Sequence, residues 1–215
     1  MALTAEGAVL EHFEEFQGRN HATVLSGFIK GCLDHLRRHE MKLDAIAVSI
    51  GPGSYTGLRI GLSEAKGLAY ALDVPLIGVD TLKIMAVNVM FANDVEPDTL
   101  FAPMIDARRM EVYTAVYDLA LNTLAAPTPL ILQPDSYSKW LAERKVLFFG
   151  NGSDKARPLF ESNPNATFIA DISPLAVDMM PLATQAYLRG DFLDLAYSVP
   201  AYLKEFQATK PRQLV

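Results

Sequence analysis

The residues best suited to chemistry form a glycine-rich segment, Ser49-Ile50-Gly51-Pro52-Gly53-Ser54-Tyr55. An apolar stretch precedes it and a helical pattern follows it, which predicts a turn from a strand into a helix. Backbone amides in such a turn, beside the positive end of a helix, suit an anion such as a phosphate group. Gly51, Gly53 and Ser54 are therefore candidate anion-binding residues. The alternative is a tight connection and nothing more, because the segment lacks the Lys-Ser/Thr of a phosphate loop and the spacing of a dinucleotide fingerprint.

The helix predicted after this turn has a face with almost no side chain. Gly57, Gly61 and Ala65 lie four residues apart, so they line one side of a helix. A smooth face of this kind lets another backbone come close. Two partners fit it, the sheet of the same chain or a second subunit.

Catalytic and metal-binding patterns are weak elsewhere. His35 and His39 have the spacing of a zinc hydrolase motif, but Leu36-Arg37-Arg38 stands between them where that motif has a glutamate, and two cations repel a metal. The single cysteine, Cys32, excludes a multi-cysteine zinc site and an intrachain disulfide. Ser54 lacks the Gly-x-Ser-x-Gly context of a hydrolase nucleophile. We predict no catalytic residue and no metal ligand.

Two polar loops remain open to a functional interpretation. Asp106-Ala107-Arg108-Arg109 is typical of a hairpin turn, and a partner contact is the alternative. Gly150-Asn151-Gly152-Ser153-Asp154 follows a strand and either caps a helix or meets a nucleotide. We favour the helix cap, because Asn, Ser and Asp are common cap residues.

The elements expected to position these residues alternate between strands and helices. The strand before the glycine turn is almost continuously apolar, as in strands that are covered on both faces. In the first half we expect a hairpin at 2–4 and 8–16, helices at 21–38 and 55–71, strands at 43–50 and 75–79, and a helix from Thr81, its cap, to Phe91.

In the second half we expect a hairpin at 100–105 and 110–117, a loop marked by Pro127, Pro129 and Pro134, a strand at 146–149, a helix at 174–188 and a loosely held tail at 204–215. This order predicts an α/β fold with mixed sheets flanked by helices. The polar stretch 93–98 is the expected boundary between two domains, residues 1–100 and 101–215.

Charge and composition limit the partners. The 215 residues carry a net charge of −6, which argues against direct binding of nucleic acid by this chain alone. The sequence contains neither a signal peptide nor an apolar run of the ~18 residues that cross a membrane. We expect a cytoplasmic protein without membrane contact.

The segment from Ser49 to Tyr70, SIGPGSYTGLRIGLSEAKGLAY, resembles the signature of the TsaB (YeaZ) family. Further stretches that are similar to family landmarks occur in the expected order at 19–21, 75–79, 106–113 and 200–204, so the resemblance covers nearly the whole chain. It implies an actin/Hsp70-like (ribonuclease-H-like) fold in two lobes. It also implies a degenerate paralogue of TsaD, the subunit that carries the metal and the transfer chemistry.

The resemblance further implies a function without catalysis by this chain. TsaB pairs with TsaD through N-terminal helices, TsaE, an ATPase, joins them, and the product is threonylcarbamoyladenosine beside the anticodon of tRNA. We therefore expect a TsaD-like and a TsaE-like partner, a homodimer when the chain is isolated, and tRNA contact through the complex alone. No cofactor is expected on this chain, with ATP or ADP bound at the level of the complex. The expected partner interface is Tyr55, Gly57, Leu58, Gly61, Leu62 and Ala65.

Two departures from the family pattern affect these expectations. At the positions where the related transferase has two metal-binding histidines, this chain has Thr81 and Met85, whose hydroxyl and thioether are poor ligands for a hard ion. Family members also begin with a central strand, whereas Met1-Ala2-Leu3 matches residues after it. Without that strand, both neighbours would keep unpaired backbone groups, at ~1–3 kcal/mol for each buried group. We expect the DNA upstream of Met1 to encode the strand in frame.

Two other functions remain as alternatives. One is an independent actin-like kinase, which needs acidic residues near the phosphates to hold magnesium. The other is a glycoprotease-like metallohydrolase, for which the four histidines offer a poor ligand set.

Overall fold

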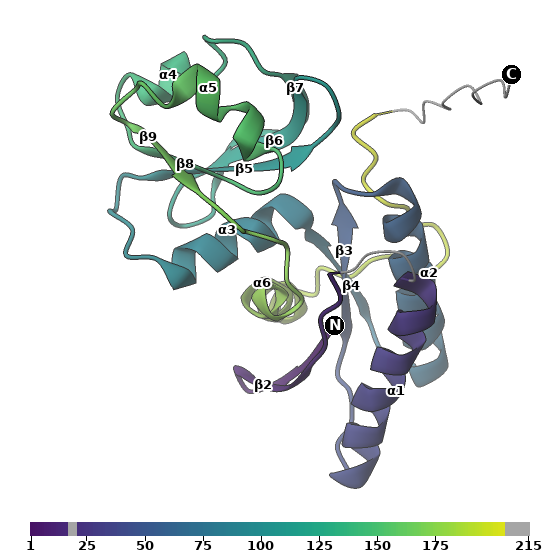
Figure 1. The fold of residues 1–215 in the computed structure, drawn as a ribbon. Coiled ribbons are helices and arrows are strands. Elements are labelled where there is room, and N and C mark those ends of the chain that lie inside the picture. The colour runs from purple at the N-terminus through teal and green to yellow at the C-terminus, as the bar shows by residue number, and fades with distance from the viewer. Residues whose placement is uncertain (17–20, 205–215) are drawn as a thin grey trace, which may run out of the picture.

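The fold is of the α/β type, and the described residues form three sheets flanked by helices. The computed structural model describes residues 1–16 and 21–204 (Figure 1). Strands β1 (Ala2–Ala5) and β2 (Ala8–His12) form an antiparallel hairpin, and β3 (Ile46–Gly51) pairs in parallel with β4 (Leu76–Asp80). The third sheet has five strands in the order β7-β6-β5-β8-β9. The predicted fold class and the predicted hairpin are confirmed, and β2 ends before the predicted residue 16.

Helix α1 (His21–Arg38) packs on the hairpin, at the bounds that the sequence predicts. Its stripe of apolar residues buries Cys32 and Leu36 against Leu3 of β1. Basic residues in the last turn of α1 suit the negative end of the helix dipole.

Helix α2 (Tyr55–Leu72) crosses from β3 to β4 and covers one face of this pair. Leu62, Ala65 and Ala69 are buried against Leu76 of β4 and the partly buried Val48 of β3. The strand leads through the glycine turn into the helix, as predicted, but it begins at Ile46. Both of its faces pack on apolar clusters, as predicted, with Val48 near Leu62 on one face and Ala47 near Ile77 on the other. It is nevertheless half-buried along most of its length. The reason is that, among the described residues, β4 is the one strand that pairs with β3.

Helix α3 (Thr81–Ala92) starts at the end of β4. Its N-cap is Asp80, whose Oδ1 accepts hydrogen bonds from the amides of Leu82 (2.7 Å) and Lys83 (3.1 Å). The prediction that Thr81 is the cap is therefore wrong by one residue, because the Asp80 carboxylate accepts from the free amides of the first turn.

The five-stranded sheet carries the largest core. Its strands are β5 (Leu100–Asp106), β6 (Glu111–Tyr117), β7 (Thr123–Ile131), β8 (Val146–Phe149) and β9 (Ala166–Ile169). The segment around Pro127 and Pro129 was expected to be a loop, and this expectation is wrong. The segment forms β7, an edge strand that pairs with β6 alone, and an edge strand tolerates proline because one side needs no amide donors.

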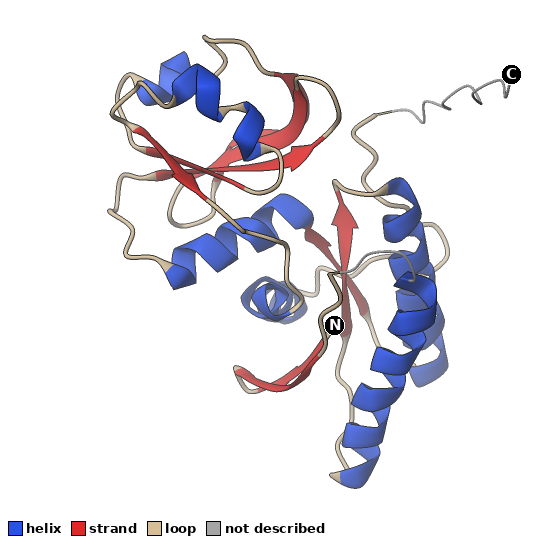
Figure 2. Ribbon diagram, in the orientation of Figure 1, coloured by secondary structure: helices blue, strands red, loops and turns tan. Residues whose placement is uncertain are grey.

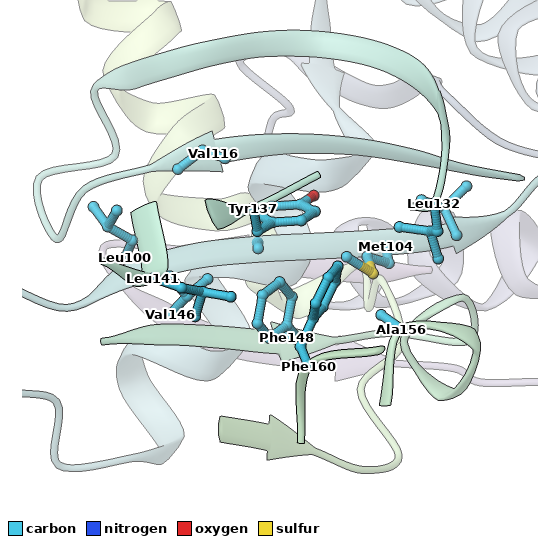
Figure 3. Close-up of a cluster of buried hydrophobic side chains, with 12 residues drawn as sticks. Leu100, Met104, Val116, Leu132, Tyr137, Leu141, Val146, Phe148, Ala156 and Phe160 are labelled. Carbon is cyan, nitrogen blue, oxygen red and sulfur yellow. The ribbon is translucent and has the colours of Figure 1, made fainter. Parts of the chain in front are cut away.

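Helices cover both faces of this sheet (Figure 2). On one face lie the short helices α4 (Ser138–Leu141) and α5 (Arg157–Phe160), where Tyr137, Phe148 and Phe160 form an aromatic cluster (Figure 3). The Tyr137 hydroxyl, although buried, shares a hydrogen bond of 2.7 Å with Thr114 Oγ1. On the other face α3 packs on the alternate residues of the strands, among them Phe101.

The chain then returns to the first half of the structure. The 3-10 turns η1 (Ser153–Lys155) and η2 (Val177–Met179) precede α5 and α6 (Met180–Arg189), and α6 packs on Ile77 and Val79 of β4. Farther on, the Leu193 amide donates to the carbonyl of Leu76. The division into domains 1–100 and 101–215 stays a prediction. In the described part of the chain, each helix is too short or too polar to cross a membrane.

The tightest glycine in the fold yields a stability prediction. A Cβ on Gly150, whose φ is +93°, would lie 2.2 Å from Met85 Cε and 2.4 Å from the carbonyl oxygen of Met104. We expect Gly150→Ala to destabilise the protein by more than ~3 kcal/mol, because overpacking adds to backbone strain. Gly190→Ala is the matched control, since Gly190 has a φ of +73° with open space around it. It should lose ~1 kcal/mol, and equal losses in urea unfolding would contradict the packing account.

Candidate functional site: a cleft at the glycine turn

The glycine turn forms one wall of a cleft of about 450 Å³. Three parts of the chain meet there, the turn with the start of α2, the hairpin between β5 and β6, and residues 201–204. The cleft therefore joins residues that lie far apart in the sequence, from Pro52 to Lys204.

The wall at Gly51 is fixed by close backbone contact. Gly51 has a φ of +116°, and a Cβ there would lie 3.0 Å from the carbonyl oxygen of Ala201. The amide of Ala201 donates to the carbonyl of Ile50 at 2.7 Å, so the C-terminal segment is tied to the end of β3. Only glycine adopts this conformation and leaves room for that segment.

Ser54 acts as the N-cap of α2. Its Oγ accepts a hydrogen bond from the Gly57 amide at 3.3 Å, and its side chain is exposed at the cleft. Next to it, the rings of Tyr55 and Tyr202 stack at 4.8 Å, and the guanidinium of Arg59 lies 5.1 Å from the Tyr55 ring centroid. The structure accounts for Ser54 as a cap, and anion binding by Gly51, Gly53 and Ser54 stays a prediction.

The hairpin opposite the glycine turn is held by charge. Asp106 Oδ1 accepts hydrogen bonds from the Arg108 amide and from Lys155 Nζ, both at 2.6 Å. The ammonium of Lys155 holds the pKa of Asp106 below its ordinary value. Arg108 and Arg109 adopt left-handed backbone conformations in the turn, and Arg108 lines the cleft. The prediction of a hairpin turn here is confirmed.

The glycine loop at residues 150–154 is connected to this hairpin by a hydrogen bond. Asn151 Oδ1 accepts a hydrogen bond from the Asp106 amide at 2.9 Å. The short turn η1 begins at Ser153, within this loop, and its N-cap residue Gly152 makes no side-chain cap hydrogen bond. The preferred interpretation of the loop as a helix cap is wrong, because its asparagine is used to hold β5.

Among the lining residues that the structure describes, Asp106 is the one carboxylate, and it is already paired with Lys155. Lys204 pairs with Glu111 beside the cleft. Arg108 and the amides at the start of α2 thus leave the cleft with positive character. Such a lining suits an anion or an acidic group of a partner better than a magnesium ion, which needs oxygen ligands.

The positions that correspond to metal ligands in the related transferase lie inside the fold. Thr81 Oγ1 shares a hydrogen bond of 2.6 Å with Ser49 Oγ, and Met85 is buried between α3 and the five-stranded sheet. His35 Nδ1 shares a hydrogen bond of 2.9 Å with Glu11 Oε1. The described residues include no cluster of three or more His, Cys, Asp or Glu side chains that is arranged to hold a metal ion.

The predicted partner interface on α2 is divided by the structure. Leu62 and Ala65 are buried against the sheet of their own chain, whereas Tyr55 and Leu58 line the cleft. Gly61 is half-buried, and a Cβ there would meet Val48 Cγ2 at 3.9 Å, an ordinary contact distance. The interface itself stays a prediction.

Sequence reasoning assigned no role to Lys155 or to residues 201–204, although the latter stretch was noted as a family landmark. Lys155 pairs with Asp106, which lies 49 residues away in the sequence. No local pattern could have joined them.

The Asp106–Lys155 pair gives a prediction about pH. A carboxyl group whose pKa is lowered by folding stabilises the fold above its unfolded pKa of ~3.9, and this stabilisation is lost as the pH falls through the folded pKa. Lys155→Met should raise the pKa of Asp106 toward ~3.9 in a carboxyl ¹³C NMR titration, since the main cause of the shift is removed. Lys145→Met, at an exposed pair with Glu96, is the control. An unchanged Asp106 titration in Lys155→Met would refute the assignment.

Comparison with known proteins agrees with the geometry. The family model described as "TsaD: tRNA N6-adenosine threonylcarbamoyltransferase" matches residues 13–211. The chain is 32% identical over 166 residues to the tRNA threonylcarbamoyladenosine biosynthesis protein TsaB of Bacillus subtilis, covering 75% of this chain and 69% of that one. It is 34% identical to TsaB of Haemophilus influenzae over 90% of this chain and 84% of that one.

Solved structures extend the match to the fold. The structure of YeaZ from Pseudomonas aeruginosa superposes with a TM-score of 0.76 and 31% identity, over 94% of this chain and 92% of that one. The expectation of an actin-like fold is thereby confirmed. From the glycine signature, the fold and these relatives together, the chain belongs to the TsaB (YeaZ) family.

Proposed function

We propose that this chain is a non-catalytic subunit of the cytoplasmic machinery that forms threonylcarbamoyladenosine on tRNA. Its relatives from Bacillus subtilis and Escherichia coli are tRNA threonylcarbamoyladenosine biosynthesis proteins, and the latter aligns with 98% of this chain at 29% identity. In this proposal a TsaD-like subunit carries out the transfer, and this chain supports it by binding.

One observation carries the non-catalytic part of the proposal. The place where the related transferase has its two histidines holds Thr81 and Met85, one turn apart on α3. Both side chains are buried, and the Thr81 hydroxyl is engaged with Ser49. A buried thioether and an engaged hydroxyl are poor ligands for a hard metal ion, so metal-assisted transfer is assigned to the partner.

The proposed partners are a TsaD-like subunit and a TsaE-like ATPase, with a homodimer when the chain is isolated. We assign contact with the TsaD-like subunit to the side of α2 that carries Tyr55, Gly57, Leu58 and Gly61. Leu62 and Ala65, which are buried, hold that helix on the sheet. The net charge of −6 supports tRNA binding through the complex and not by this chain alone.

We also propose that this chain requires no cofactor of its own and that ATP or ADP binds at the level of the complex. The support comes from the cleft, whose one described lining carboxylate, Asp106, is paired with Lys155. An actin-like kinase needs free carboxylates near the phosphates for magnesium. This pairing therefore favours a binding role over the kinase alternative.

Reconstitution tests the proposed function. The chain, a TsaD-like subunit, a TsaE-like ATPase, unmodified tRNA and a threonylcarbamoyl donor are combined, each protein is omitted in turn, and the modified nucleoside is measured by mass spectrometry. We expect product with all three proteins, none with this chain alone, and a loss of at least about tenfold when this chain is omitted, equivalent to ~1.4 kcal/mol.

Two results would contradict the proposal. Modified nucleoside formed by this chain without the TsaD-like subunit would make it a catalyst. Full activity after its omission would deny it any role as a subunit. ATP hydrolysis by the purified chain alone serves as the test of the kinase alternative.

A further inference from the structure

The C-terminal segment 196–204 is held on α2 and on the end of β3. Lys66 Nζ on α2 donates to the carbonyl of Ser198 at 2.6 Å. Farther along the segment, the ring of Tyr202 stacks on that of Tyr55 at the start of α2. The backbone hydrogen bond from this segment to the end of β3 adds a third contact. These three contacts fix the segment beside the glycine turn.

The end of the same segment reaches the five-stranded sheet. Lys204 Nζ forms an ion pair with Glu111 Oε2 at the start of β6. Figure 1 shows the segment in yellow, passing beside β3 toward the five-stranded sheet. The segment therefore spans the cleft, from the glycine turn on one wall to the hairpin between β5 and β6 on the other.

Two covalent connections also join the five-stranded sheet to the rest of the structure. Residues 93–99 lead from α3 into β5, and residues 170–176 lead from β9 to η2. Apart from Thr99, which is buried, each residue of these two connections is half-buried or exposed. A few loop residues with little packing can absorb the changes of backbone angle that a rotation of the sheet requires.

The contacts at the two ends of the segment differ in strength. Backbone hydrogen bonding and ring stacking hold the segment on β3 and α2, whereas an ion pair holds it on the hairpin, and the lysine side chain of that pair is 36% exposed. Ion pairs at exposed positions are weak and are screened by salt. The hairpin is itself bonded to Lys155 and Asn151, so it moves with the sheet. The ion pair is therefore the contact that breaks first.

We propose that the segment 196–204 is a latch that sets the width of the cleft. While Lys204 is paired with Glu111, the hairpin is held near the glycine turn and the cleft has its volume of about 450 Å³. When this pair breaks, the segment stays on α2, the five-stranded sheet rotates away from the glycine turn, and the cleft widens. Leu203 and Lys204 belong to the lining, so the opening also changes one wall of the cleft.

Pulsed electron–electron double resonance on the full chain measures this opening. Spin labels are attached to cysteines at two exposed positions, Ser63 on α2 and Ala126 on β7, in a Cys32→Ala background. Lys204→Met removes the charge and keeps an apolar side chain. We expect it to populate a label distance that is longer by about 2 Å or more. The fraction of molecules at this distance should rise about twofold to fivefold, as the loss of an exposed ion pair allows.

Matched variants and salt test whether the ion pair is the cause. Lys204→Arg keeps the charge and should keep the closed distance distribution. Arg37→Met removes an exposed ion pair within α1 and should also leave the distribution unchanged. In the labelled chain without these substitutions, ~1 M NaCl shortens the Debye length to about 3 Å and should populate the same longer distance. An unchanged distribution in Lys204→Met or in high salt overturns the proposal, as does equal opening in Lys204→Arg or Arg37→Met.

Discussion

The structure depends on the backbone at Gly51, where β3 ends. The left-handed conformation there turns the chain toward α2, and the missing side chain lets Ala201 approach and bond to Ile50. This single contact brings the glycine turn and the C-terminal segment together. The cleft and the Tyr55–Tyr202 stack both follow from it.

Helix α2 packs on the sheet with one side and borders the cleft with its first turn. Leu62, Ala65 and Ala69 attach it to β3 and β4, so its position is set by the core. Its first turn borders the cleft and stays accessible to a partner, whereas Gly61 is half-buried and its Cβ position lies 3.9 Å from Val48 Cγ2. A subunit that works by binding needs a rigid surface more than it needs reactive groups. The burial of Thr81 and Met85 agrees with such a role.

Local pattern was enough to predict much of the fold. The bounds of α1 and the sequence of strand, glycine turn and helix follow from periodicity and from glycine, and the structure reproduces them. The errors arose where tertiary context decides. Pro127 and Pro129 fit in β7 because that strand is an edge. The Asp106–Lys155 pair and the Ala201 contact join distant segments, and no spacing in the sequence encodes them.

The central claim is that the start of α2 and its half-buried Gly61 take part in a binding surface, and partner affinity tests it most directly. The variants Gly61→Leu and Gly67→Leu make the same change on one helix, and the surroundings of Gly67 are open. For Gly61→Leu we expect a tenfold to hundredfold weaker affinity for the TsaD-like subunit, corresponding to ~1–3 kcal/mol of overpacking. Gly67→Leu should bind like the wild type, and the melting temperature of each variant shows whether Leu at position 61 also damages the packing against Val48. A folded Gly61→Leu variant that binds as tightly as Gly67→Leu would contradict the account.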